Sequence, residues 1–253
     1  MVGEHHVSWL EREGTDPPLI LLHGWGAEAA SFGGLLRLCL TPRRLVAVDL
    51  PGFGESPMGS TSWTTASYAG VVRELVSSRG WVRVSLLGHS YGGRVALRLA
   101  SEPPPLLDRL VLCAAAGLRV PSEGALGARV RAYRALRFSA ETTLPRRLSG
   151  PTVEWLRQRL GSADYRAAGP LRPTLVHAVQ EDLSTLAEQI TVPTLIVWGG
   201  RDLDLPLDPY GRRLRQLISS SELVEFERSG HFPFADEPAR FAAVLDSFAD
   251  AKL

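Results

Sequence analysis

Residues 86–94 read Leu-Leu-Gly-His-Ser-Tyr-Gly-Gly-Arg, and this stretch decides the fold that the whole chain predicts. An apolar run over 84–87 stops at Gly88, and after Gly92 apolar residues return at the spacing of one helix face. The pattern indicates a strand, a sharp turn and a helix. Ser90 lies at the turn, in the arrangement Gly-x-Ser-x-Gly, where a strained backbone exposes the serine hydroxyl above the sheet.

Further apolar runs alternate with helical segments on both sides of this turn. The strands predicted are 19–22, 45–50, 82–87, 110–115, 194–198 and 222–226, with an edge strand within 5–13 and a turn at 16–18. The helices predicted are 31–40, 62–79, the segment after Ser90, 209–218 and 236–250. This alternation is typical of an α/β protein with a mostly parallel, doubly wound sheet.

The alternation is interrupted between residues 118 and 187. No strand is predicted there, and the helical spacing is broken by five prolines, Pro121, Pro145, Pro151, Pro170 and Pro173. We therefore expect a core domain made of 1–117 and 188–253, with a helical cap inserted at 118–187.

Composition excludes several classes of function. The chain has 253 residues and a formal charge of +1, which fits one large domain and gives no reason to expect a nucleic-acid partner. Cys39 and Cys113 both lie in apolar runs, so two buried thiols are expected rather than a disulfide or a metal site. With neither a leader pattern nor a long apolar span, we expect a cytoplasmic protein that does not bind membranes.

Two later strands are also followed by polar residues that suit catalysis. Asp202 follows the strand at 194–198, and His231 follows the strand at 222–226. Because the carboxyl ends of parallel strands share one edge, Ser90, Asp202 and His231 are expected to meet there. A serine hydroxyl becomes a good nucleophile when an imidazole takes its proton, and a carboxylate orients that imidazole.

Five stretches together resemble the α/β-hydrolase superfamily: His23-Gly24-Trp25-Gly26, residues 49–56, residues 88–93, residues 198–202 with Pro206, and Gly230-His231 with Glu237-Pro238. The resemblance covers almost the whole chain apart from the cap. It implies Ser90 as nucleophile, His231 as base and Asp202 as acid, with the backbone amides of Trp25 and Tyr91 forming an oxyanion hole. It implies hydrolysis of a small-molecule ester, with neither a cofactor nor a metal.

Several other polar residues compete for these roles. Asp204 is the rival acid, but Asp202 directly follows the glycine loop and lies four positions before Pro206, as the family pattern has it. For Asp49 we expect local backbone capping. His23 and His89 are expected to support loop geometry rather than to transfer protons.

The substrate is less readable, because the cap would select it. The segment from Arg119 to Arg172 contains eleven arginines and four acidic residues, an excess of seven positive charges. This excess indicates either a solvated helix surface or a dock for an acidic partner or anionic substrate. The stretches 23–26 and 49–54 resemble those of esterases whose pimeloyl ester is attached to an acidic carrier protein.

Other activities of the same fold stay open. Serine rather than aspartate at position 90 argues against dehalogenases and epoxide hydrolases. A carbon–carbon bond hydrolase of ring-cleavage products, an aminopeptidase, a hydroxynitrile lyase and a non-catalytic ligand receptor remain alternatives to the carboxylesterase that we expect.

Overall fold

The computed structural model describes residues 2–59, 63–103, 106–119, 164 and 167–251. Within these residues one seven-stranded sheet has the order β1-β3-β2-β4-β5-β6-β7. The strands are β1 (Trp9–Arg12), β2 (Thr15–Leu22), β3 (Arg43–Val48), β4 (Val84–His89), β5 (Leu107–Cys113), β6 (Thr194–Gly199) and β7 (Ser221–Phe226). Only β1 is antiparallel to its neighbour, so the mostly parallel sheet predicted from the sequence is confirmed.

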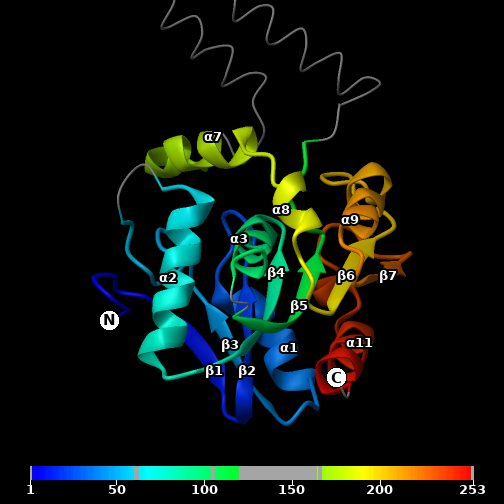
Figure 1. The fold of residues 1–253 in the computed structure, drawn as a ribbon, viewed down its shortest axis with the longest axis horizontal. Coiled ribbons are helices and arrows are strands. Elements are labelled where there is room, and N and C mark those ends of the chain that lie inside the picture. The colour runs from blue at the N-terminus through cyan, green and yellow to red at the C-terminus, as the bar shows by residue number, and fades with distance from the viewer. Residues whose placement is uncertain (1, 60–62, 104–105, 120–163, 165–166, 252–253) are drawn as a thin grey trace, which may run out of the picture.

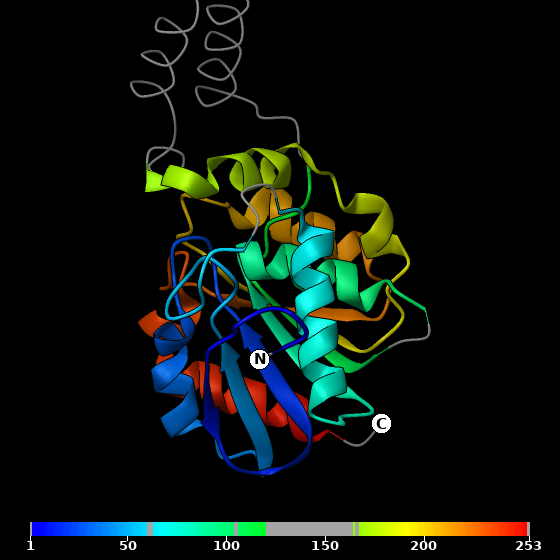
Figure 2. The same cartoon turned by 90° about the vertical axis from the view of Figure 1, so that its left-hand side faces the viewer.

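Helices cover both faces of the sheet (Figures 1 and 2). One face carries α2 (Thr65–Ser78), α3 (Tyr91–Ala100), α8 (Ser184–Glu188) and α9 (Arg212–Leu217). The other carries η1 (Ala29–Phe32), α1 (Gly33–Leu38), α10 (Pro233–Asp236) and α11 (Pro238–Asp250). Figure 2 shows α1 and α2 on opposite sides of the strands.

The strands are apolar on both faces because each face is covered. In β2, Ile20 and Leu22 belong to the core beneath α2 and α3, whereas Leu19 and Leu21 belong to the core beneath α1 and α11. Successive side chains of a strand point to opposite faces, so a continuous apolar run serves both cores. This explains why the central strands read as unbroken apolar runs in the sequence.

The turn predicted at residues 16–18 is wrong. These residues lie inside β2, which begins at Thr15, and the pairing with β3 shifts its register between Thr15 and Leu19. A proline cannot donate to a strand ladder, and a register irregularity is a place where prolines are accommodated. Pro17 and Pro18 therefore interrupt the strand without ending it.

Three predicted helices are each divided into two elements. Residues 209–218 contain the end of η3 (Leu207–Gly211) followed by α9. Residues 31–40 contain the end of η1 followed by α1, and residues 236–250 contain the end of α10 followed by α11. Glu237, between α10 and α11, has non-helical dihedrals of φ −129° and ψ 61°. It precedes Pro238, whose ring disfavours helical geometry in the preceding residue.

The described part of the predicted cap is helical. It contains η2 (Gly169–Leu171), α7 (Arg172–Gln180) and α8, while residues 120–163 and 165–166 lie outside the described residues. Figure 1 shows α7 beyond the carboxyl ends of the parallel strands, and α8 packs against α3 and α9. Of the predicted cap, the structure therefore describes the part that includes α7 and α8.

Two smaller expectations concern cysteines and membrane spans. Cys39 and Cys113 are both buried and free, as predicted. Among the helices that the structure describes, none combines the length and the apolar character needed to cross a bilayer.

Candidate active site

Ser90 occupies the turn between β4 and α3 with strained backbone dihedrals, φ 50° and ψ −109°. Positive φ is unfavourable for a residue with a side chain and persists where surrounding contacts enforce it. Here the Ser90 amide donates to the Cys113 carbonyl at 3.1 Å, and the Ser90 carbonyl accepts from the Ala116 amide at 3.0 Å. The end of β5 thus holds the strained turn in place.

The glycines on either side of Ser90 are required by close packing. A Cβ atom at Gly88 would lie 2.6 Å from the Gly92 carbonyl oxygen, and one at Gly92 would lie 2.3 Å from the Leu22 carbonyl oxygen. Both distances are far inside van der Waals contact, and both obstacles are backbone atoms. The two glycines allow α3 to start directly against the ends of β4 and β2.

Asp202 and His231 come together at the same edge of the sheet. Asp202 follows β6, His231 follows β7, and the His231 Nδ1 atom donates to Asp202 Oδ2 at 2.7 Å. The second carboxylate oxygen, Oδ1, accepts the amides of Asp204 and Leu205, each at 2.9 Å. The Asp202 side chain is fully buried, so these three donors take the place of water around the carboxylate.

Asp204, the rival acid, has a different position. Its side chain is exposed, and its backbone amide rather than its carboxylate contacts Asp202. Asp202, Asp204 and His231 do offer ligand atoms within 4.8 Å of one another, the spacing of a small metal site. Both carboxylate oxygens of Asp202 already accept hydrogen bonds. Of the two acids, only Asp204 therefore has carboxylate oxygens without a hydrogen-bond partner among the described residues.

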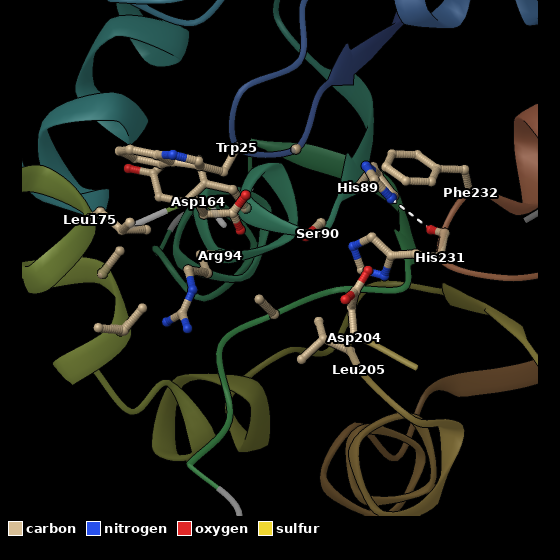
Figure 3. Close-up of a pocket in the computed structure, with 15 residues that line it drawn as sticks. Trp25, His89, Ser90, Arg94, Asp164, Leu175, Asp204, Leu205, His231 and Phe232 are labelled. Carbon is tan, nitrogen blue, oxygen red and sulfur yellow. Dashed lines mark hydrogen bonds between the residues drawn. The ribbon is translucent and has the colours of Figure 1, made fainter. Parts of the chain in front are cut away.

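Ser90 and His231 line one cavity of about 440 Å³ (Figure 3). This volume is within the range of small-molecule pockets in proteins. With its proton on Nδ1, His231 has an unprotonated Nε2 atom that can accept. No hydrogen bond joins the two side chains in this structure, which is common before a substrate is bound.

The loop after β2 forms another part of the cavity wall. Trp25 and Tyr91 both line the cavity, and their rings meet edge to face at 5.2 Å. The Gly92 amide donates to the His23 carbonyl at 3.0 Å, which fixes this loop against the start of α3. Neither the Trp25 amide nor the Tyr91 amide has an acceptor among the described residues.

His23 and Asp49 hold loops, as the sequence analysis expects. The His23 Nε2 atom accepts from the Leu50 amide at 3.0 Å, and its Nδ1 donates to the Gly24 carbonyl at 2.8 Å. Burial lowers the pKa of His23, which keeps the neutral form that this pair of bonds requires. Asp49 accepts the amides of Ala29 and Glu55.

His89 supports the backbone of His231. Its Nε2 atom donates to the His231 carbonyl at 2.9 Å, and its ring lies 4.9 Å from the His231 ring. Burial, assisted by the neighbouring His231, lowers the pKa of His89 to about 3. His89 therefore stays neutral near pH 7 and keeps this contact.

The sequence analysis missed the residues that form the remainder of the cavity. Arg94 enters it from α3, Leu175 and Val179 from α7, and the Asp164 side chain also lines it. Asp204, which the sequence analysis considered only as a rival acid, lines it as well. The sequence does contain a signal for Arg94, because a residue four positions after Ser90 returns to the same helix face. The α7 residues carry no such signal, since the packing of α7 over the sheet cannot be deduced from its sequence.

A sequence model described as the Alpha/beta hydrolase family matches residues 19–244. The pimeloyl-[acyl-carrier protein] methyl ester esterase of Neisseria meningitidis serogroup B is 30% identical over 248 residues, covering 92% of this chain and 93% of that protein. An uncharacterized Mycobacterium tuberculosis protein is 30% identical over 269 residues, covering 94% of this chain and 76% of that protein.

The fold is similar to that of a solved esterase. The esterase of Exiguobacterium antarcticum superposes with a TM-score of 0.74 at 25% sequence identity, covering 99% of this chain and 97% of that one. Sequence and structure comparisons thus agree over almost the full length of the chain.

Proposed function

The chain belongs to the alpha/beta hydrolase family, and on that premise we propose that it cleaves carboxylic esters through an acyl-enzyme intermediate. Ser90 is the nucleophile, His231 the general base and Asp202 the acid that orients the base. The observation that carries the proposal is the 2.7 Å hydrogen bond from His231 Nδ1 to the buried Asp202 carboxylate, at the edge of the cavity that Ser90 lines.

The first step forms the bond between Ser90 Oγ and the ester carbonyl carbon. As this bond forms, the Ser90 proton passes to Nε2 of His231, and the imidazolium is stabilised by the Asp202 charge. Because Asp202 is held by three donors, it stays in place while His231 changes its charge. The imidazolium then gives its proton to the departing alkoxide, which leaves as the alcohol.

The carbonyl oxygen becomes negatively charged in both halves of the reaction. The free amides of Trp25 and Tyr91 are the donors proposed to stabilise it, and one such donor contributes about 3 kcal/mol in related chemistry. In the second half, His231 takes a proton from water, the hydroxide attacks the acyl carbon, and the Ser90 oxygen leaves with the returned proton.

We favour carboxylic esters over other substrates because the relatives and the geometry of the site both support ester hydrolysis. The Neisseria relative is named for a methyl ester attached to a carrier protein, and the Exiguobacterium neighbour is named an esterase. A helical cap over residues 118–187, with an acidic partner docked on its arginines, remains part of the proposal. No described contact favours carbon–carbon bond cleavage over ester cleavage.

Turnover of p-nitrophenyl butyrate tests the proposed function. We expect steady hydrolysis preceded by a burst of one p-nitrophenol per active chain, because an activated phenyl ester acylates the enzyme faster than water removes the acyl group. Ser90→Ala should remove both phases while keeping the fold. The exposed Ser77 of α2 gives the matched control, and Ser77→Ala should keep both phases. Hydrolysis that survives Ser90→Ala would contradict the proposal.

A further inference from the structure

Arg94 is the cationic side chain of the described cavity wall. It lies in α3, four residues after Ser90, and both residues line the cavity. Four residues correspond to about one helical turn, or roughly 6 Å along the axis. In Figure 3 the Arg94 side chain extends away from α3 on the side of Ser90 opposite to His231 and Asp204.

This guanidinium has no acidic partner among the described residues. Its one hydrogen bond runs from Nη1 to the Glu181 backbone carbonyl at 3.4 Å, a long distance for such a bond. The Glu181 carboxylate is engaged elsewhere: one oxygen pairs with Arg98, and the other accepts from Thr65 Oγ1 at 2.6 Å. The carboxylate of the residue that Arg94 contacts through its backbone is thus committed to Arg98, the next arginine along the helix.

The partly buried position of Arg94 makes its lack of an acidic partner energetically unfavourable. The side chain is half-buried, and burial lowers the pKa of its guanidinium, while more distant groups such as Glu181 and Tyr91 act in the opposite direction. Arginine remains protonated at ordinary pH, so a positive charge stays in the partly desolvated wall of a cavity. Charges in such places are normally paired, because desolvation is otherwise uncompensated.

We propose that Arg94 binds a carboxylate group of the substrate, so that the substrate is an ester that also carries a free carboxylate. This inference rests on the proposed ester hydrolysis and specifies its substrate class. A guanidinium presents a planar fork of N–H donors that matches the two oxygens of a carboxylate.

The other residues of the cavity wall indicate the chemistry of the rest of the substrate. Leu175, Ala178 and Val179 of α7 supply apolar surface to the same cavity. Asp164 and Asp204 add negative charge, which opposes a doubly charged phosphate more strongly than a single carboxylate. The substrate therefore has an apolar segment between the ester at Ser90 and the carboxylate at Arg94.

Matched pairs of esters test the role of Arg94. One pair places the carboxylate in the acyl part, mono-p-nitrophenyl glutarate against p-nitrophenyl pentanoate. The other places it in the leaving group, meta-carboxyphenyl butyrate against phenyl butyrate. For each pair the measurement is the ratio of kcat/KM for the charged ester to that for the neutral one.

We expect Arg94→Met to lower this ratio by about tenfold to a hundredfold for at least one pair, the range of a hydrogen bond to a charged group. Arg94→Lys, which keeps the charge and loses the fork, should give an intermediate ratio. Arg73→Met is the matched control, since Arg73 lies on α2, does not line the cavity and pairs with Glu102, and its ratio should stay at the wild-type value. Thermal unfolding of each variant shows whether it is folded.

A binding measurement separates this inference from the proposed function. Monomethyl glutarate and dimethyl glutarate are titrated calorimetrically into the Ser90→Ala protein, with and without Arg94→Met. Arg94→Met should weaken the binding of monomethyl glutarate at least tenfold and the binding of dimethyl glutarate much less. This result needs no turnover, so a chain that hydrolyses no ester still reports on Arg94. Ratios and affinities that Arg94→Met leaves unchanged, or lowers equally for charged and neutral ligands, would overturn the proposal.

Discussion

His231 Nδ1 donates to Asp202 Oδ2 at 2.7 Å, and the side chain that accepts this bond is completely buried. The bond fixes the tautomer in which Nε2 faces the cavity unprotonated. An amide at position 202 could donate to Nδ1 and so favour the opposite tautomer. We expect Asp202→Asn to lower kcat for p-nitrophenyl butyrate by roughly 10⁴-fold, with the protein still folded.

The neighbouring acid gives the control for this change. Asp204→Asn removes a charge two residues away and leaves both the Asp202 carboxylate and the Asp204 backbone amide in place. It should therefore cost far less in kcat than Asp202→Asn. If Asp204→Asn proved the more damaging substitution, Asp204 rather than Asp202 would be the acid that supports His231.

A second prediction concerns the glycine that allows α3 to approach β2. A methyl group at Gly92 would meet the Leu22 carbonyl oxygen at 2.3 Å, and a backbone oxygen cannot move aside as a side chain can. We expect Gly92→Ala to lower the free energy of unfolding by about 1–3 kcal/mol or more, as overpacking does. Urea unfolding at neutral pH measures it.

Gly70 in α2 provides the opposite case in the same protein. A Cβ atom there would have no neighbour within 4 Å. Alanine in a helix interior is favoured over glycine by about 0.5–1 kcal/mol, so Gly70→Ala should raise the stability. Equal effects of the two substitutions would show that backbone entropy, rather than the contact with Leu22, governs Gly92.

Much of this site is predictable because its signals are local. A strand, a turn and a helix are predicted by the five-residue pattern of Gly88, Ser90 and Gly92. The acid Asp202 and the base His231 each follow a strand that the sequence also predicts. The rule that carboxyl ends of parallel strands share an edge then brings distant positions together. Asp202 and His231 are found in contact at that edge, as this reasoning predicts.

The remainder depends on packing that no local pattern encodes. The strand through Pro17 and Pro18 is maintained by its pairing with β3, which overrides the preference of those residues for a turn. The spacing of Arg94 from Ser90 places both residues on one helix face, but it does not show that Arg94 lacks an acidic partner. The role proposed for Arg94 depends on two tertiary contacts: α7 forms a wall of the cavity, and the Glu181 carboxylate pairs with Arg98 rather than with Arg94.

The stability of the protein should fall in mild acid because of His89. Its pKa is about 3 in the folded protein against 6.5 for an ordinary histidine, so the unfolded chain binds one more proton between these values. Stability is then fully present above about pH 6.5 and falls as the pH drops, by up to about 1.4 kcal/mol per pH unit from this group.

His89→Gln tests this assignment, because glutamine can keep a donor near the His231 carbonyl and cannot be protonated. The free energy of unfolding should vary less steeply with pH in the variant than in the wild type between about pH 4 and pH 6. Identical slopes in both proteins would mean that other groups cause the acid dependence.

Salt tests the proposal that the arginines of the cap attract an acidic partner or an anionic substrate. Exposed charges act mainly on encounter and are screened beyond about 8 Å at physiological salt. Added salt should therefore lower kcat/KM for a carrier-linked or anionic ester more than for a neutral one, with kcat little changed. Arg131, Arg134 and Arg137, which lie outside the described residues, are predicted from their spacing to share one helix side. Neutralising all three should reduce that difference, whereas equal salt dependence would leave them a solvated surface.

The central claim is that Ser90 forms the covalent intermediate, and labelling with a fluorophosphonate tests it most directly. After incubation, intact mass and peptide mapping identify how many groups are attached and where. We expect one adduct per chain, located on Ser90, with its rate of formation greatly reduced in Asp202→Asn because the base is misoriented. Ser77→Ala should label as the wild type does, and Ser90→Ala should not label. An adduct on any other residue, or labelling that persists in Ser90→Ala, would contradict the account.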